Sequence, residues 1–220
     1  MMKKILAVLL SCIPASIFAA VLTVPAQYSS IQLAINASVD GDSVIVSPGS
    51  YFENVNFRGK NICLTSLYYL TGDTSYISST IINGSTPAFP DTASCVLIVS
   101  GEDSTAILQG FTLTGGAGTS WLDIHNLNSY REGGGIFIEL SSPEILHNII
   151  INNHVINTVG VVSTGGGGIR MGDSNPLIQN NLIINNEAIY GPGIVMNYSG
   201  ATIRNNIIAS NYGGANYYGG

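Results

Sequence analysis

Charged side chains are scarce in this chain, and a few polar residues fall where they can act together. Only 9% of the 220 residues are Asp, Glu, Lys or Arg, against roughly 25% in an ordinary soluble domain. In three glycine-led strand segments, alternation turns Glu139, Arg170 and Asn197 to the outer face, and Asp173 follows at a strand end. A guanidinium beside carboxylates and an amide can neutralise an acidic group and take up a proton. The pattern predicts a substrate-binding cleft at these four residues, with an exposed ion pair among solvated polar groups as the alternative.

A second set of candidates lies in the segment 119–132, which we expect to be a variable loop. It contains Trp121, the only tryptophan of the chain, and Tyr130. Aromatic rings on a loop beside a strand face can stack on sugar rings, but they can equally pack the loop onto the core. Both residues are candidates for substrate binding, and both interpretations of Trp121 stay open.

Established motifs of catalysis and metal binding are absent from the sequence. There is no Gly-x-Ser-x-Gly, no His-Glu-x-x-His, no phosphate-binding loop, no calcium loop and no cysteine cluster. Catalytic residues stay unassigned and no cofactor is predicted, with Ca²⁺ entering only if the protein is a lyase. Cys63 and Cys95 lie in apolar strand-like runs, which leaves open both buried thiols and one disulfide.

An internal repeat specifies the elements that must position these side chains. Residues 143–153, 176–186 and 201–211 align without gaps, and residues 105–115 form a degenerate fourth copy in which Ile107 aligns with Ile145. The copies are unequally spaced, which is typical of a solenoid whose coils share a cross-section while one loop varies. Their short β-branched runs, broken by Asn or Gly, favour strands over helices. Three short strands per coil predict a parallel β-helix.

Stacked coils place equivalent residues of the copies above one another. We expect two internal stacks of apolar side chains, Ile145, Ile178 and Ile203 in one and Ile151, Ile184 and Ala209 in the other. We also expect two ladders of hydrogen-bonded amides at the corners, Asn148, Asn181 and Asn206 in one and Asn153, Asn186 and Asn211 in the other. Because Asn tolerates the left-handed backbone of a corner, the ladders are interpreted as structural.

The region before the repeats has a different pattern. Ser29 or Ser30 can cap a short helix in which Ile31, Ala34 and Ile35 share one face. That helix would close the end of the solenoid, within a cap of about residues 23–42. Strand-length runs at 43–51, 53–57 and 61–65 then predict the first coil.

The block from Tyr28 to Ser66, with its DGDSVIVSPGSYFENVNF segment, and the later GGGI…SPEILHNIIINN units resemble right-handed parallel β-helix repeat proteins of the pectate-lyase-like superfamily, especially exported bacterial ones. The resemblance covers nearly all of residues 23–220. It implies an all-β, single-stranded right-handed parallel β-helix with a short N-terminal capping helix, in a carbohydrate-related or cell-surface setting. It specifies no activity, because lyases, hydrolases, esterases, epimerases and noncatalytic surface proteins share the fold.

The first residues have the charged, apolar and small-residue parts of a signal peptide. We expect residues 1–19 to be removed by cleavage after Ala19, and the protein to be secreted or held at the cell surface. A lipoprotein signal with Cys12 as the lipidated residue is the alternative. Residues 20–220 then form one β-helix domain, and the glycine-rich segment 217–220 indicates that it is C-terminally truncated.

Charge and hydropathy narrow the choice of partners. Loss of residues 1–19 changes the formal net charge from −6 to −8, which disfavours nucleic acid and anionic membranes. The apolar leader is too short to be a stable membrane span. We expect a monomer whose partner is a polysaccharide or a cell-surface glycan.

Three functions fit these observations. The first is a secreted or cell-surface protein that interacts with carbohydrate and has no demonstrable catalytic site. The second is a polysaccharide lyase-like enzyme that acts on uronic-acid polymers through Arg170 with Glu139 or Asp173. The third is a structural stalk or adhesin. Exposed aromatic residues along one face favour glycan binding, an acidic cluster facing an arginine favours the lyase, and a featureless face favours the stalk.

Overall fold

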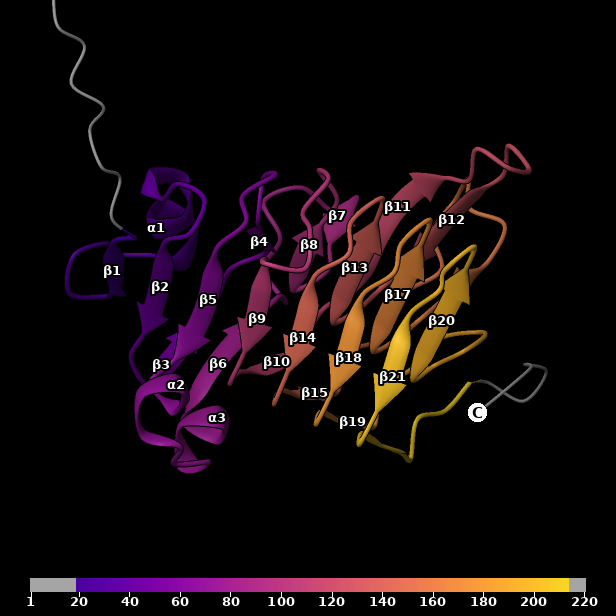
Figure 1. Ribbon diagram of the computed structural model, residues 1–220. Coiled ribbons are helices and arrows are strands. Elements are labelled where there is room, and N and C mark those ends of the chain that lie inside the picture. Colours follow the sequence, from indigo (N-terminus) through magenta and orange to yellow (C-terminus); the bar gives the residue numbers. More distant parts are fainter. Residues whose placement is uncertain (1–18, 214–220) are drawn as a thin grey trace, which may run out of the picture.

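The computed structural model describes residues 19–213, which form a right-handed parallel β-helix (Figure 1). The predicted leader at residues 1–18 and the expected opening of a further coil at 214–220 lie outside the described residues. Three all-parallel sheets run along the solenoid, because each new coil adds its strands beside those of the coil before it. The predicted all-β solenoid is confirmed.

In each of the three sheets, the strands follow one another in chain order from the N-terminal end. Sheet A contains β1 (Val21–Val24), β2 (Ser43–Val46), β5 (Cys63–Ser66), β9 (Ile107–Gln109), β14 (Glu144–Leu146), β18 (Leu177–Gln179) and β21 (Thr202–Arg204). Sheet B contains β3 (Gly49–Tyr51), β6 (Thr80–Asn83), β10 (Thr112–Thr114), β15 (Ile149–Ile151), β19 (Leu182–Ile184) and β22 (Ile207–Ala209). Sheet C contains β4 (Val55–Asn56), β8 (Val96–Ile98), β13 (Ile136–Glu139), β17 (Ile169–Gly172) and β20 (Ile194–Asn197).

The first coil differs from the predicted one. Residues 43–51 form two strands, β2 and β3, because the chain bends at Pro48 and passes from sheet A into sheet B. The run at 61–65 does not complete the first coil. It leads into β5, which pairs with β2 and begins the second coil.

The core is a column of apolar side chains between the three sheets. The register confirms the predicted stack in sheet A, where Ile145 pairs with Ile178 and Ile178 with Ile203. The second predicted stack is wrong by one residue, because Ile150 and Ile183 are the fully buried side chains of β15 and β19. Alternation does not continue through the corner between strands, since the left-handed residue there resets which side chains face inward.

The degenerate repeat is shifted by one residue from the predicted alignment. Ile145 pairs with Leu108 rather than with Ile107. Gly110, with φ 78°, takes the left-handed corner position that His147, with φ 54°, holds in the next coil. Glycine adopts this conformation without steric cost, so the corner persists although the sequence around it differs.

Both predicted asparagine ladders are present. The backbone N–H of Asn148 donates to Oδ1 of Asn181 at 2.9 Å, and that of Asn181 donates to Oδ1 of Asn206 at 2.8 Å. The second ladder connects Asn153, Asn186 and Asn211 in the same way. The left-handed backbone belongs to the residue before each ladder position, for example Asn180 with φ 58°, and not to the ladder asparagine itself.

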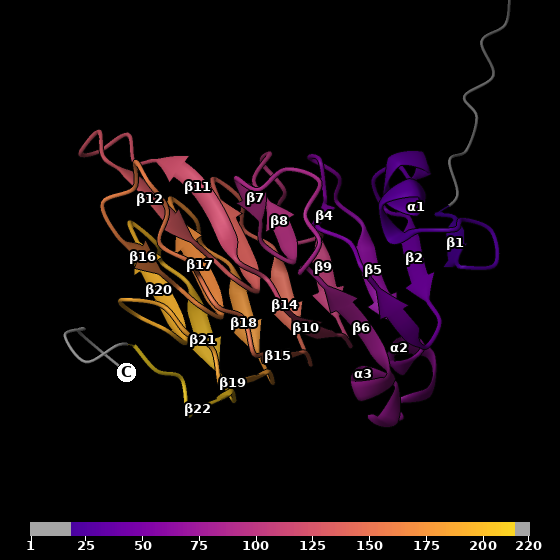
Figure 2. The ribbon, with the colours of Figure 1, turned by 180° about the vertical axis from the view of Figure 1, so that it is seen from behind.

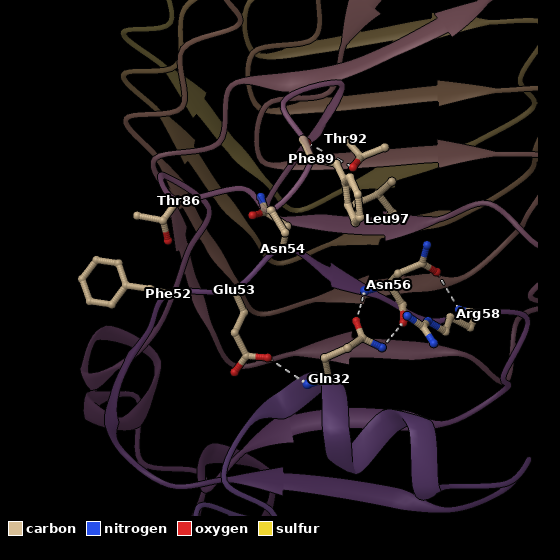
Figure 3. A pocket seen from close by; sticks show the side chains of 11 residues that line it. Gln32, Phe52, Glu53, Asn54, Asn56, Arg58, Thr86, Phe89, Thr92 and Leu97 are labelled. Carbon is tan, nitrogen blue, oxygen red and sulfur yellow. Dashed lines mark hydrogen bonds between the residues drawn. The ribbon is translucent and has the colours of Figure 1, made fainter.

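Helix α1 (Ile31–Ala37) packs at the N-terminal end of the solenoid, as predicted, and the hydroxyl of Ser30 accepts a bond from the N–H of Leu33 at 3.2 Å. Strand β1, which was not predicted from the sequence, extends sheet A beyond β2. On its outer side, α1 holds sheet C through Gln32, whose side chain bonds the backbone of Asn56 in β4 (Figure 3).

Two additions project from the coils. Helices α2 (Tyr68–Thr71) and α3 (Ser75–Ser79) lie between β5 and β6. The segment expected to be a loop at 119–132 is instead a hairpin of β11 (Gly118–Leu122) and β12 (Ser129–Glu132), which extends beyond the coils in both views (Figure 2). The hairpin forms the mixed sheet D with β7 (Thr92–Ala93) and β16 (Thr164–Gly165). β11 and β12 pair locally with each other, but the pairing with β7 and β16 joins residues distant in sequence, which a local pattern does not reveal.

Candidate functional site

The outer face of sheet C carries the charged residues that the sequence analysis selected. Arg170 on β17 is the register partner of Phe137 on β13, and Glu139 and Asn197 flank Gly172 in the neighbouring column. The predicted alternation of sheet C is therefore confirmed. The surroundings of these side chains decide what they can do.

Arg170 lies beneath the hairpin of β11 and β12 and not in an open cleft. Its side chain is 1% exposed, and its Cζ atom lies 3.8 Å from the ring centroid of Trp121 and 4.8 Å from that of Phe137. The rings of Trp121 and Phe137 meet edge-on, with their centroids 6.0 Å apart. Trp121 thus packs the hairpin onto sheet C, and solutes do not reach the guanidinium of Arg170 in this conformation.

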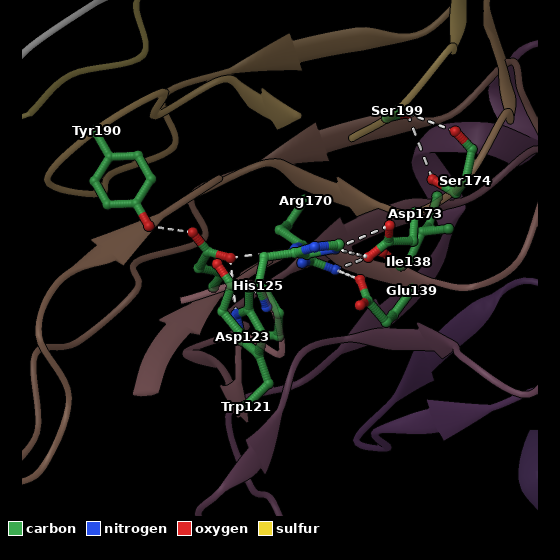
Figure 4. A network of polar contacts seen from close by, with 11 residues as sticks. Trp121, Asp123, His125, Ile138, Glu139, Arg170, Asp173, Ser174, Tyr190 and Ser199 are labelled. Atoms are coloured by element: carbon green, nitrogen blue, oxygen red, sulfur yellow. Dashed lines mark hydrogen bonds and ion pairs between the residues drawn. The ribbon is translucent and has the colours of Figure 1, made fainter. Parts of the chain in front are cut away.

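Glu132, which was not selected from the sequence, connects the hairpin to the solenoid through its contacts with Trp121, Arg170 and Tyr190, three side chains labelled in Figure 4. One carboxylate oxygen of the buried Glu132 accepts bonds from Nε1 of Trp121 at 2.8 Å and from Nε of Arg170 at 3.1 Å. The hydroxyl of Tyr190 donates to the other oxygen. Arg170 also forms an ion pair with Glu139. We call these five side chains the buried network.

The electrostatics of the buried network follow from its burial. Burial raises the pKa of Glu132, while the Tyr190 hydroxyl, the Arg170 guanidinium and the Trp121 indole oppose that rise. Burial and the neighbouring Glu132 carboxylate both raise the pKa of Tyr190, so that its phenol stays protonated and donates. Two carboxyl groups share one guanidinium, which leaves Arg170 no spare charge for a substrate.

Gly172 makes room for this ion pair. A Cβ atom at position 172 would overlap the guanidinium of Arg170 and the carboxylate of Glu139. The glycine therefore has a packing role between its register partners Glu139 and Asn197.

The tip of the hairpin reaches back to the ends of the sheet C strands. Nε2 of His125 lies 3.0 Å from Oδ2 of Asp173, and the His125 ring stacks on that of Tyr198 with centroids 3.8 Å apart. The tip is itself ordered by Asp123, whose oxygens accept from the backbone N–H of His125 at 2.9 Å and from Nδ2 of Asn126 at 2.8 Å. Asp173 thus fastens the hairpin from the outside.

A pocket of about 400 Å³ opens between the hairpin and β20. We call it the hairpin pocket; it is lined by Asp123, Asn126, Tyr130, Tyr190, Asn197 and Tyr198. The Tyr130 hydroxyl accepts a bond from Asn126 at 3.2 Å, and Tyr198 is 69% exposed. Three phenol rings, two amides and a carboxylate therefore surround one hollow.

The six sequence-selected residues fall into two groups. Tyr130 and Asn197 line the hairpin pocket, whereas Trp121, Glu139, Arg170 and Asp173 hold the hairpin that forms its wall. Glu132 of the buried network and Tyr190 and Tyr198 of the hairpin pocket were not predicted from the sequence. Tyr198 had a usable signal, since it is an aromatic residue directly after the selected Asn197.

Within residues 19–213, no three His, Cys, Asp or Glu side chains are grouped so that they could hold a metal ion. None of the helices in that part of the chain is long and apolar enough to cross a membrane. Cys63 and Cys95 are free thiols, and Cys95 is buried.

Comparison with known proteins gives one match. A family model described as protein of unknown function (DUF1565) matches residues 23–219. Neither a curated protein nor a solved structure matches the sequence significantly. The matched range includes the whole hairpin and every strand of sheet C.

Proposed function

The chain belongs to the DUF1565 family, whose description assigns no function, and from this premise we propose that it is an exported protein that binds carbohydrate at the hairpin pocket. The signal-peptide pattern of residues 1–19 supports export to the cell surface or the medium. The β-helix coils and the repeat units support a place in the pectate-lyase-like superfamily, and with it a polysaccharide or cell-surface glycan as the partner.

The observation that carries this proposal is the lining of the hairpin pocket. Tyr130, Tyr190 and Tyr198 offer aromatic rings to the apolar side of a sugar, with His125 stacked on Tyr198, and Asn126 and Asn197 offer amides to its hydroxyl groups. The pocket is within the size range of small-molecule sites. Its walls are held by the buried network, so that little ordering is needed on binding.

The lyase alternative has weaker support from the same contacts. A lyase needs a cation that is free to neutralise the substrate carboxylate. Arg170 is buried and shared between Glu132 and Glu139. The stalk alternative predicts a featureless face, whereas the outer side of sheet C carries aromatic residues around two pockets.

Binding to a panel of soluble and insoluble polysaccharides tests the proposal, with isothermal titration calorimetry on those retained. Replacing Tyr198, which is 69% exposed, by Ala should weaken binding by about tenfold or less, the value of one stacking contact. Tyr69→Ala is the matched control, because Tyr69 on α2 is 57% exposed and lies away from sheet C.

Two results of this experiment would contradict the proposal, and a third would replace it. Equal loss in the Tyr198 and Tyr69 variants, or no retention on any glycan, would contradict carbohydrate binding at the hairpin pocket. Ultraviolet absorbance from unsaturated sugar ends on uronic-acid polymers would replace the binding proposal with the lyase. Export is tested separately, since the N-terminal sequence of the secreted protein should begin at Ala20.

A further inference from the structure

A second pocket of about 360 Å³ lies on the outer face of sheet C, over β4 and β8 (Figure 3). Its lining includes Phe52, Asn54, Asn56, Arg58, Phe89 and Leu97, and we call it the phenylalanine pocket. The strand order of sheet C places it on the opposite side of the hairpin from the hairpin pocket, because the hairpin covers β13 and β17 between them. The two pockets share no lining residue.

Two phenyl rings at this pocket are exposed to solvent. Phe52 is 59% exposed and Phe89 is 73% exposed. Both residues line the pocket, and Phe52 lies on the side away from Asn56 and Arg58 (Figure 3). Exposed apolar groups that gather at a concave polar site are typical of a ligand-binding surface.

The polar floor of the phenylalanine pocket is held in place before any ligand arrives. The N–H of Asn56 donates to Oε1 of Gln32 at 2.7 Å, and Nε2 of Gln32 donates to the carbonyl oxygen of Asn56 at 3.1 Å. Nδ2 of Asn54 donates to the carbonyl oxygens of Gly84 and Ser94. Among residues 19–213, Nδ2 of Asn56 and Oδ1 of Asn54 have no hydrogen-bond partner, so a donor and an acceptor remain for a ligand.

Arg58 gives this pocket a free positive charge. Four other cations of the described chain are already engaged: Lys60 with three carbonyls at the end of α1, Arg131 with the carbonyls of Ala117 and Pro90, Arg170 with two carboxylates and Arg204 with Gln179. The exposed Arg58 side chain makes no hydrogen bond or ion pair with any described residue. The carboxylate of Glu53, in the same lining, accepts from the backbone N–H groups of Ile31 and Gln32 at 2.9 Å each.

We infer that the phenylalanine pocket binds a sugar residue that bears an anionic group. The phenyl ring of Phe89 packs on the apolar face of the sugar, the amides of Asn54 and Asn56 bond its hydroxyl groups, and the guanidinium of Arg58 pairs with the anion. Carboxylate and sulfate groups both suit this chemistry. The phenylalanine pocket is then a second, charge-selective site beside the hairpin pocket. It rests on the proposed function only in that its ligand is also a carbohydrate.

Calorimetric titration with three oligosaccharides of similar size tests the inference: trigalacturonate, its neutral methyl ester, and a sulfated galactose trisaccharide. We expect at least one anionic probe to bind more tightly than the ester. Arg58→Gln should abolish that preference, weakening the anionic probe about tenfold while leaving the ester unchanged. Arg204→Gln removes the same charge from sheet A and should behave as wild type. The anionic probe that binds more tightly shows whether the pocket recognises a carboxylate or a sulfate group.

Two further variants separate this site from the hairpin pocket. Phe89→Ala should weaken the ester and the anionic probes alike, whereas Tyr198→Ala should leave the Arg58-dependent preference intact. Equal losses in the Arg58 and Arg204 variants, or equal affinity of the wild type for all three probes, or no binding of any, would overturn the inference. If the preference persists while Tyr198→Ala has no effect on any glycan, only the proposed function of the hairpin pocket fails. Thermal unfolding of each variant checks that it is folded.

Discussion

Arg170 lies on the predicted face of its strand, but its side chain is not accessible to solvent. Alternation placed Arg170 on the outer face of sheet C, and the register agrees. Whether an outer residue meets solvent depends on what covers it, and here Trp121 of the hairpin does. The sequence carried no local signal for this cover, because the covering side chain comes from a segment about 50 residues away.

Arg170→Met should destabilise the fold strongly. The substitution keeps the apolar stem but leaves Glu132 and Glu139 without their cation, and removing one partner of a buried ion pair typically costs about 3–5 kcal/mol. Urea unfolding measures this change. Arg204→Met, at an exposed position, should shift stability by less than about 0.5 kcal/mol. A loss below about 1 kcal/mol in Arg170→Met would show that the buried network contributes little.

The two thiols should be unreactive in the native protein and should make its stability depend on alkaline pH. Burial raises the pKa of Cys63 to about 11 and that of Cys95 to about 12. From the ordinary thiol pKa near 9 up to these values, the native state holds more protons than the unfolded chain. Stability should therefore fall as pH rises above about 9.

A thiol-reactive chromophore measures the reactivity in a variant with Cys12 replaced by Ser, and urea unfolding of the same variant at pH 8 and pH 10.5 measures the change in stability. At pH 8, Cys95 should not react until the protein unfolds, and Cys63 should react slowly. The same protein in urea, where two thiols should react at once, is the control. Rapid native reaction of both, or an unfolding midpoint unchanged between pH 8 and pH 10.5, would contradict the burial of these groups.

At the scale of elements, the repeats were predictable and the additions were not. The strands β14, β18 and β21 follow from apolar runs that end in Asn corners, and the Ser30 cap identified α1. The hairpin was expected to be a loop although β11 and β12 pair locally, and its attachment to β7 and β16 depends on contacts distant in sequence. Glu132 was not predicted either. Its position just before Gly133 indicates a role in holding the hairpin only once the hairpin itself is known.

Glu132→Gln should loosen the hairpin without unfolding the coils. Gln has one acceptor oxygen where the carboxylate serves three donors, so that an amide N–H₂ must face a donor or leave it unpaired. Trp121, the only tryptophan, reports on the hairpin, and its fluorescence maximum should shift to longer wavelength. Glu144→Gln on β14, a half-exposed position, should leave the spectrum unchanged. An unshifted spectrum in Glu132→Gln would mean that ring packing alone holds the hairpin.

At the scale of the whole molecule, the scarcity of charge follows from the solenoid. Interior positions are taken by stacked Ile, Leu and Val and the corners by Asn and Gly, so that few positions remain for Lys or Glu. Most cations that do occur have internal partners, as Lys60 and Arg170 do. Arg58, whose side chain has no partner among the described residues, is therefore the cation that we expect to bind a ligand. Composition alone predicted the scarcity but could not tell which cations were engaged.

Because each coil is stabilised by its neighbours, a ladder residue should matter according to its place in the stack. Asn181 is 2% exposed, accepts from the N–H of Asn148, and donates to the carbonyl oxygen of Ile145 at 2.8 Å. Asn181→Ala leaves these groups buried and unpaired, which should cost about 2–4 kcal/mol. Asn206, in the last described coil, is more exposed, so that water can replace its amide and Asn206→Ala should cost about 1–2 kcal/mol. Urea unfolding gives both values, and hydrogen exchange should show faster opening of β14 and β18 in Asn181→Ala. Equal costs at the two positions would indicate that the ladder amides contribute independently of their burial, and no cost at either would indicate that the coils do not stabilise one another through them.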